Sequence, residues 1–304
     1  MKVSACIITY NHENYIRECL EGAINQIIDY DYEIVISDDK SSDNTLQICL
    51  DYASKYPNLI RILPSESNLG MIGNWIKSIS NCKGEYIALC EGDDYWTDPY
   101  KLQKQVDFLE ENHDYVMSFH NRFLVDNFNK KLDFDDKYPY SKKILTQEEM
   151  ICGSYAPTQT LVCLNAALKE FPKNIRVFNG DTFIIAWLGQ FGKAYFHEDI
   201  MPSAYRIHNG GVFSQIDNSI KVFHAFHTFL SIQKHIQPKY KDLLDDKIAM
   251  HAYNSISNGY YKTIDMEKPI ILVLFKLCLK HPRLFNLFFR ATLKYLHKLT
   301  QYEA

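Results

Sequence analysis

The stretch Gly84-Glu85-Tyr86-Ile87-Ala88-Leu89-Cys90-Glu91-Gly92-Asp93-Asp94-Tyr95-Trp96 decides the fold class and points to the chemistry. Residues 85–90 form a short apolar run of the kind that makes a buried strand. Three carboxylates follow that strand directly, and clustered carboxylates repel one another. A hard divalent cation with oxygen ligands is the usual way to offset such repulsion. For the cluster taken alone, a solvated acidic turn is the alternative.

Strands and helices alternate in the chain before this stretch. The apolar runs predict strands at 3–9, 33–37 and 60–63, and helical spacing of apolar residues predicts helices at 15–27, 43–56 and 71–80. This alternation predicts βαβ units and a largely parallel sheet. In such sheets ligands bind at the carboxyl ends of the strands, near a switch in strand order.

Two other strand ends carry polar residues. The first predicted strand is followed by Thr9-Tyr10-Asn11-His12, and the second by Asp38-Asp39-Lys40-Ser41-Ser42-Asp43. Adjacent carboxylates at a strand end could accept hydrogen bonds from a nucleobase or from ribose hydroxyls. Capping of the next helix is the alternative for this second run.

The pattern changes after the acidic stretch. A helix is expected to start at Asp98-Pro99, followed by extended residues 115–126, a strand at 157–163, a helix at 181–190 and two short strands within 193–207. From about residue 216 the sequence is typical of helices. We therefore expect a catalytic domain over 1–215, with halves 1–97 and 98–215, and a helical extension over 216–304.

Composition and missing motifs exclude several classes of protein. The net charge of −4 argues against a nucleic-acid binder. No Gly-x-Gly-x-x-Gly or P-loop motif follows the first strand, which disfavours dehydrogenases, P-loop enzymes and nucleotidyltransferases with a glycine-rich loop. Without such a loop, a metal ion would have to neutralise a bound diphosphate, and the acidic cluster suits that need.

The blocks at 3–11, 33–45, 68–70 and 84–96, taken in this order and spacing, resemble inverting glycosyltransferase family 2 of the bacterial polysaccharide type. The resemblance covers about residues 2–210. It implies an α/β structure of the GT-A fold, with a mostly parallel Rossmann-like sheet flanked by helices, here followed by the helical extension. One departure stands out, because the first acid of the family's usual Asp-x-Asp motif is Glu91 in this chain.

The resemblance also implies roles for individual residues. It implies Asp181 as the catalytic base, at a helix start where Gly180 replaces a usual acidic neighbour and where simple helix N-capping is the alternative. It implies metal ligands at Glu91 and Asp93, holding Mn²⁺ or Mg²⁺. The segment 203–212 matches one that closes over the diphosphate. The residues implied to bind the nucleotide or donor are Thr9, Tyr10, Asn11, Asp38, Asp39, Asn74, Asp94, Arg206 and His208.

The implied activity is metal-dependent, inverting transfer of a hexosyl or N-acetylhexosaminyl group. The donor would be a nucleotide-diphosphate sugar, commonly a UDP-sugar, and the acceptor a hydroxyl of a glycan or lipid-linked molecule in surface polysaccharide synthesis. A catalytically silent module that binds nucleotide sugar or glycan is the alternative, favoured only by Glu91 and Gly180.

The C-terminal residues 268–304 contain seven Lys or Arg and a single acid, Glu303. One helical stripe between 283 and 298 is basic or polar, and the rest of that surface is strongly apolar. This pattern predicts contact of residues 268–300 with an anionic membrane surface; packing on the catalytic domain, or on a second subunit of a homo-oligomer, is the alternative. The sequence shows neither a signal-peptide pattern nor a spanning apolar run. We therefore expect a cytoplasmic protein that is at most peripheral on the inner face of the cell membrane.

Overall fold

The computed structural model of the chain describes residues 1–132, 142–211, 216–260 and 270–302, with side chains described up to residue 296. Its strands are β1 (Val3–Thr9), β2 (Tyr32–Asp38), β3 (Ile60–Leu63), β4 (Tyr86–Glu91), β5 (Tyr115–His120), β6 (Arg122–Val125), β7 (Ile144–Leu145), β8 (Val162–Leu164), β9 (Lys193–His197) and β10 (Ser203–Arg206). Its α-helices are α1 (Ile16–Ile24), α2 (Thr45–Lys55), α3 (Gly70–Asn81), α4 (Lys101–Glu111), α5 (Gln147–Ile151), α6 (Gly180–Leu188), α7 (Asn218–His235), α8 (Asp245–Ser257), α9 (Ile270–Lys280) and α10 (Phe285–Tyr302).

The central sheet has the strand order β3-β2-β1-β4-β8-β5-β9-β7. Strand β1 pairs in parallel with both β2 and β4, and β2 pairs in parallel with β3. The short strand β8 runs antiparallel between β4 and β5, whereas β5 and β9 are parallel. The prediction of a mostly parallel α/β sheet flanked by helices is therefore confirmed.

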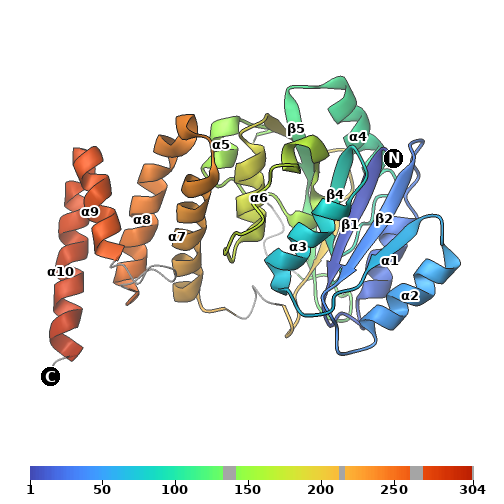
Figure 1. Ribbon diagram of the computed structural model, residues 1–304, viewed down its shortest axis with the longest axis horizontal. Helices are drawn as coiled ribbons and strands as arrows, with labels where there is room; N and C mark the ends of the chain where they lie inside the picture. Colours follow the sequence, from blue (N-terminus) through green and yellow to red (C-terminus); the bar gives the residue numbers. More distant parts are fainter. Residues whose placement is uncertain (133–141, 212–215, 261–269, 303–304) are drawn as a thin grey trace.

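Apolar strand residues are buried on both faces because helices cover both sides of the sheet (Figure 1). On one side Ala5 and Ile7 of β1 pack with apolar residues of α1, α2 and α4. On the other side Cys6 and Ile8 pack with residues of α3 and α6. A strand covered in this way needs a continuous apolar run rather than an alternating one, which is what residues 3–8 supply.

Two predicted boundaries were wrong. The helix expected at Asp98-Pro99 begins at Lys101, after a turn in which the Asp98 carboxylate accepts hydrogen bonds from the backbone N–H groups of Tyr100 and Met201. The strand expected at 157–163 begins at Val162, after a short 3₁₀ turn at Thr158–Thr160.

The helices after residue 216 form successive layers that lead away from the sheet, from α7 through α8 to α9 and α10 (Figure 1). One continuous apolar cluster runs from Ile8 in the sheet through Phe226 of α7 and Ile248 of α8 to Ala291 of α10. The predicted boundary between 215 and 216 lies at the edge of residues 212–215, which fall outside the described residues, so it stays a prediction. Within the described part of the chain, no helix combines the length and apolarity that crossing a bilayer requires.

Candidate functional site

The acidic loop after β4 is fixed against the end of β1. The backbone N–H of Gly92 donates to the carbonyl of Ile8, and the N–H of Asp94 donates to the carbonyl of Glu91. A Cβ atom at position 92 would lie only 2.6 Å from Thr9 Oγ1 and 2.9 Å from Ile16 Cδ1. Glycine is therefore required here, because it lets the turn that carries Asp93 and Asp94 pack directly on the first strand.

The acidic loop fits a divalent cation. One carboxylate oxygen from each of Glu91, Asp93 and Asp94 can be chosen so that all lie within 4.8 Å of one another. Asp93 Oδ1 and Asp94 Oδ2 are both buried without a hydrogen-bond partner among the described residues. Leaving two buried carboxylate oxygens unsatisfied is costly, and Mg²⁺ and Mn²⁺ prefer such oxygens as ligands.

The electrostatics of the cluster are those of crowded, buried acids. Burial, with the charges of Asp93 and Asp181 nearby, raises the pKa of Glu91 to about 8. Burial and the neighbouring Asp93 also raise the pKa of Asp94 well above its usual value. Burial would raise the pKa of Asp93 as well, but His12 and His208 lower it below its ordinary value. A bound cation would offset the repulsion that, together with burial, produces the first two shifts.

Two histidines flank Asp93. His208 Nε2 lies 3.0 Å from Asp93 Oδ2, and His12 Nε2 lies 3.8 Å from the same oxygen. His12 Nδ1 lies 3.2 Å from Thr9 Oγ1, which orients the ring toward the acid. The structure thus brings the predicted His208 into the site. No role was predicted for His12 from the sequence, although its place directly after Asn11 at a strand end was the available signal.

Arg206 is buried and committed to three acceptors. Its Nε donates to the Asp93 carbonyl, Nη1 to the Asp126 carbonyl and Nη2 to Asn129 Oδ1. Its backbone N–H donates to Asp94 Oδ1 at 2.8 Å. In this structure Arg206 therefore ties strand β10 to the acidic loop, and a direct phosphate contact stays a prediction.

Asp181 lies in the first turn of α6, beneath the acidic cluster. Asn179 is the N-cap residue, so Asp181 itself is not the cap; its Oδ1 accepts from the backbone N–H of Thr182 at 2.7 Å. Burial raises the pKa of Asp181. The charge of Asp181 contributes to the raised pKa of Glu91, so the two carboxyl groups lie close enough to interact electrostatically. A Cβ at Gly180 would lie 2.6 Å from Ile72 Cδ1, so an acidic residue in this position would require the Ile72 side chain to move.

The residues predicted to hold the nucleotide lie in two adjoining loops at the carboxyl ends of β1 and β2. Asn11 Oδ1 accepts from the backbone N–H of Ser42, and its positive φ of 56° lets the loop turn. Asp38 accepts two hydrogen bonds from Ser41, while Asp39 Oδ1 accepts from the backbone N–H of Leu69.

Three of the predicted donor-binding residues, Thr9, Tyr10 and Asn74, differ in their exposure and in their hydrogen bonds. Thr9 is buried beside His12, whereas Tyr10 is 46% exposed and open to a ligand. Asn74 is buried, and both ends of its amide are bonded to Ser37. Its contacts are therefore structural in this state, and its part in donor binding stays a prediction.

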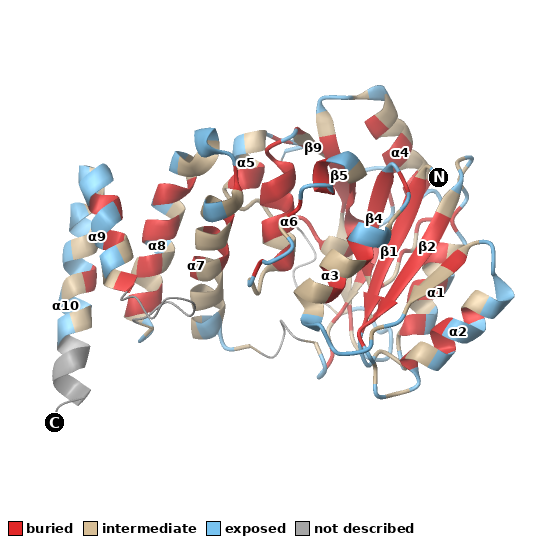
Figure 2. Ribbon diagram, in the orientation of Figure 1, coloured by how far each residue is buried: buried red, intermediate tan, exposed pale blue. Residues whose placement is uncertain are grey.

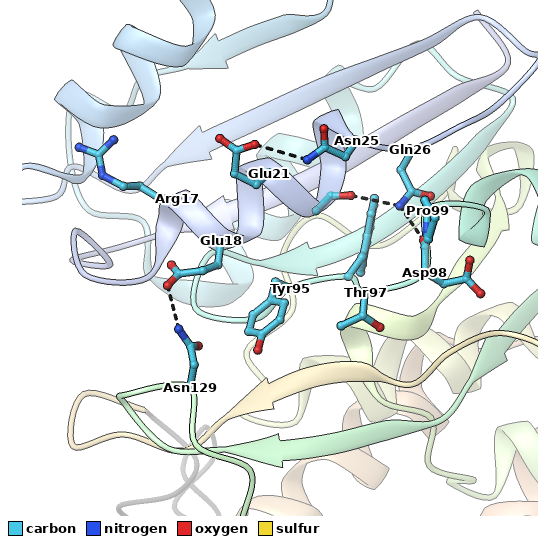
Figure 3. A pocket seen from close by; sticks show the side chains of 12 residues that line it. Arg17, Glu18, Glu21, Asn25, Gln26, Tyr95, Thr97, Asp98, Pro99 and Asn129 are labelled. Carbon is cyan, nitrogen blue, oxygen red and sulfur yellow. Dashed lines mark hydrogen bonds between the residues drawn. The ribbon is translucent and has the colours of Figure 1, made fainter.

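A separate open cleft of about 630 Å³ lies behind the acidic loop, between α1 and the 95–99 segment (Figure 3). Glu18 reaches across it to accept a hydrogen bond from Asn129 at 3.0 Å. Asn129 also receives the Arg206 hydrogen bond, so the wall of this cleft helps to hold Arg206. The predicted site residues do not line the cleft.

Known proteins with solved structures share the whole architecture. Staphylococcus aureus TarS in complex with UDP-GlcNAc superposes with a TM-score of 0.69 at 20% identity, over 98% of this chain and 89% of that chain. The mannosyltransferase PcManGT of Pyrobaculum calidifontis, in complex with GDP-Man and Mn²⁺, gives a TM-score of 0.61 at 16% identity, over 97% and 87% of the two chains. At these identities the likeness establishes the fold, which is the predicted GT-A type.

Sequence relatives extend the comparison. An uncharacterised protein of Mycobacterium tuberculosis is 38% identical over 162 residues, which are 53% of this chain and 46% of that protein. The putative glycosyltransferase EpsE of Bacillus subtilis is 32% identical over 127 residues, 42% of this chain and 45% of that protein. The matched part is thus less than half of the length of either relative. Residues 4–167, more than half of the chain, match the family model described as Glycosyl transferase family 2. The chain belongs to glycosyl transferase family 2.

Proposed function

We propose that this chain transfers a sugar from a nucleoside-diphosphate sugar to a hydroxyl of a glycan or lipid-linked acceptor during surface polysaccharide synthesis. The observation that carries the proposal is the pair of unpartnered buried oxygens, Asp93 Oδ1 and Asp94 Oδ2, in a cluster whose electrostatic neighbour is Asp181. That arrangement supplies a cation site and a base at one edge of the sheet. The relatives support the class, since TarS is described with UDP-GlcNAc and PcManGT with GDP-Man.

The proposed cofactor is Mn²⁺ or Mg²⁺, held by Asp93 with help from Glu91 and Asp94. When bound, such an ion neutralises charge on the departing diphosphate. His208 and His12 flank Asp93, where they orient its carboxylate and offer nitrogen ligands. Glu91 is one methylene longer than the usual aspartate, and one of its carboxylate oxygens lies within 4.8 Å of oxygens of Asp93 and Asp94.

The proposed donor site uses the loops after β1 and β2. Tyr10 is exposed enough to stack on a base, while the buried carboxylates of Asp38 and Asp39, which accept from Ser41 and Leu69, shape the loops at the strand ends. We assign the base as uracil, in line with the UDP complexes of TarS. Arg206 keeps the acidic loop in place, through its bond to the Asp93 carbonyl, while the diphosphate leaves.

The proposed general base is Asp181. Burial raises its pKa, which makes the carboxylate a stronger proton acceptor. It takes the proton of the acceptor hydroxyl as the hydroxyl oxygen attacks the anomeric carbon and the nucleoside diphosphate departs from the opposite face. A single displacement of this kind inverts the anomeric centre. We place the activity in the cytoplasm, where nucleotide sugars are available, at the inner face of the cell membrane.

A panel of hexosyl and N-acetylhexosaminyl nucleotide sugars tests the proposal, each incubated with and without Mn²⁺. Release of nucleoside diphosphate that depends on the metal is expected for at least one UDP-sugar. Donor binding without turnover, for every sugar and with acceptor extracts added, would instead identify the silent binding module. In a parallel assay with a nucleoside triphosphate and a sugar 1-phosphate, release of pyrophosphate would identify a nucleotidyltransferase.

A further inference from the structure

Helix α10 exposes a stripe of large apolar side chains. Phe285, Phe289, Leu293 and Leu296 are 46%, 63%, 54% and 52% exposed. With about 100° of rotation per residue, these four positions fall within one narrow sector of the helix. Four large apolar groups in a row on the surface form a patch rather than scattered exposure, and such patches mark interaction sites.

This stripe is not the face by which α10 packs on the protein. Ala291 is fully buried, and Leu284, Leu287, Phe288 and Tyr295 pack against the apolar cluster that includes α8. The helix is therefore already docked on one side, and the exposed stripe lies beside that buried side. Packing on the catalytic chain, the alternative expected from the sequence, explains only the buried side.

Helix α9, like α10, has one buried apolar face and a separate stripe of exposed apolar side chains. Leu272, Phe275 and Leu279 are exposed and follow helical spacing, whereas Leu274, Leu277 and Cys278 are buried. The rings of Phe275 and Phe288 lie 5.3 Å apart, so the α9 stripe abuts α10. Together the two helices form the end of the molecule farthest from the sheet, and Figure 2 shows exposed residues along both of them.

The charged side chains carried by α9 and α10 themselves are all basic. Residues 270–302 contain no Asp or Glu. Lys276 is exposed next to the α9 stripe and Arg290 beside the α10 stripe, whereas the exposed Lys294 lies nearer α8, where its Nζ donates to Ser257 Oγ. Lys280 and Arg283 are paired with acids of the 242–246 segment. The apolar stripes are therefore bordered by cations that complement an anionic surface.

We infer that the exposed faces of α9 and α10, defined by Leu272, Phe275, Leu279, Phe285, Phe289, Leu293 and Leu296 with Lys276, Arg290 and Lys294, dock on an anionic lipid bilayer. An amphipathic helix that lies in the plane of the interface buries this kind of stripe among acyl chains and keeps its basic border at the headgroups. A second copy of the chain is a poorer occupant, because joining the same face of two copies would bring like charges together. The inference goes beyond sugar transfer and needs no donor or acceptor.

Vesicle co-sedimentation of the full chain tests the inference, with vesicles of phosphatidylcholine alone and of phosphatidylcholine mixed with phosphatidylglycerol. The apolar variant is Phe289→Ser/Leu293→Ser, and the basic variant is Arg290→Gln/Lys294→Gln. Ile27→Ser, at a residue that is 52% exposed on another surface, is the matched apolar control, and Lys169→Gln is the basic control. Circular dichroism melting verifies that each variant is folded.

Binding is expected only to the vesicles that contain phosphatidylglycerol. The apolar variant should bind them at least about tenfold more weakly for each large side chain removed, and the basic variant about fivefold more weakly for each charge removed. Both controls should bind as the wild type does. Equal binding of all folded variants overturns the inference. A chain that ignores vesicles but sediments as a dimer, which the apolar variant breaks, also overturns it and assigns the face to self-association.

Discussion

Replacing Arg206 with lysine should destabilise the fold by breaking the tie between β10 and the acidic loop. The guanidinium donates to three acceptors in different directions, the carbonyls of Asp93 and Asp126 and the side chain of Asn129. A lysine ammonium on a flexible stem cannot reproduce that fork and keeps at most one of the three bonds. A hydrogen bond to a charged group contributes about 1.5–3 kcal/mol, so the loss of two lowers the free energy of unfolding by about 3–6 kcal/mol.

Urea unfolding followed by tryptophan fluorescence measures this loss as a shift of the midpoint at an unchanged slope. Asn129→Ala is the matched control, because it removes one acceptor and leaves the Arg206 bonds to two carbonyls; we expect it to cost about 1.5–3 kcal/mol, half of the loss expected for Arg206→Lys. If Arg206→Lys unfolds within about 0.5 kcal/mol of the wild type, the range of a neutral surface substitution, then Arg206 does not hold the loop.

Three further outcomes follow from other parts of the structure. Asp181→Asn should lower the transfer rate by about a hundred- to ten-thousand-fold, yet leave the affinity for UDP unchanged in calorimetry; full activity removes Asp181 from the mechanism. Gly92→Ala should cost about 1–3 kcal/mol in thermal unfolding, because the new methyl group would overlap Thr9 Oγ1, and an unchanged melting temperature contradicts this close packing. Burial would raise the pKa of Asp245, but hydrogen bonds from Lys280 and His281 lower it below its unfolded value. The ionised carboxylate therefore contributes about 1–3 kcal/mol to the free energy of unfolding above about pH 4, and this contribution is lost as the pH falls through the folded pKa. The stability difference between wild type and Asp245→Asn should therefore shrink on acidification, and a difference independent of pH is inconsistent with that pairing.

Much of the fold follows from local sequence patterns. The strand expected at 3–9 is β1, because a fully buried parallel strand needs an uninterrupted apolar run, and the strand expected at 60–63 is the partly buried edge strand β3. The rule that ligands gather at the carboxyl ends of such strands then directs attention to the loops carrying Asp38 and Asp93. The position of these loops follows from the parallel arrangement of the strands and needs no detail of side-chain packing. It could therefore be predicted from a single sequence.

Features that depend on distant contacts could not be predicted. The Asp98 carboxylate accepts a hydrogen bond from the backbone N–H of Met201, a contact across 103 residues of sequence. The commitment of Arg206 to carbonyls, and of Asn74 to Ser37, likewise appears only once the chain is folded. His12 reaches Asp93 because β1 and β4 are neighbours with their ends in register, which residue spacing does not reveal.

The central claim is that the acidic loop holds a divalent cation together with the diphosphate of the donor. Isothermal titration of UDP into the chain, with and without Mn²⁺, tests it most directly. Asp93→Asn is the test variant, and Asp51→Asn, at an exposed helical position, is the control. We expect Mn²⁺ to strengthen UDP binding to the wild type and to the control, and this effect to disappear in Asp93→Asn. UDP binding that is indifferent to Mn²⁺ in the wild type, or equally strengthened by Mn²⁺ in Asp93→Asn, would contradict it.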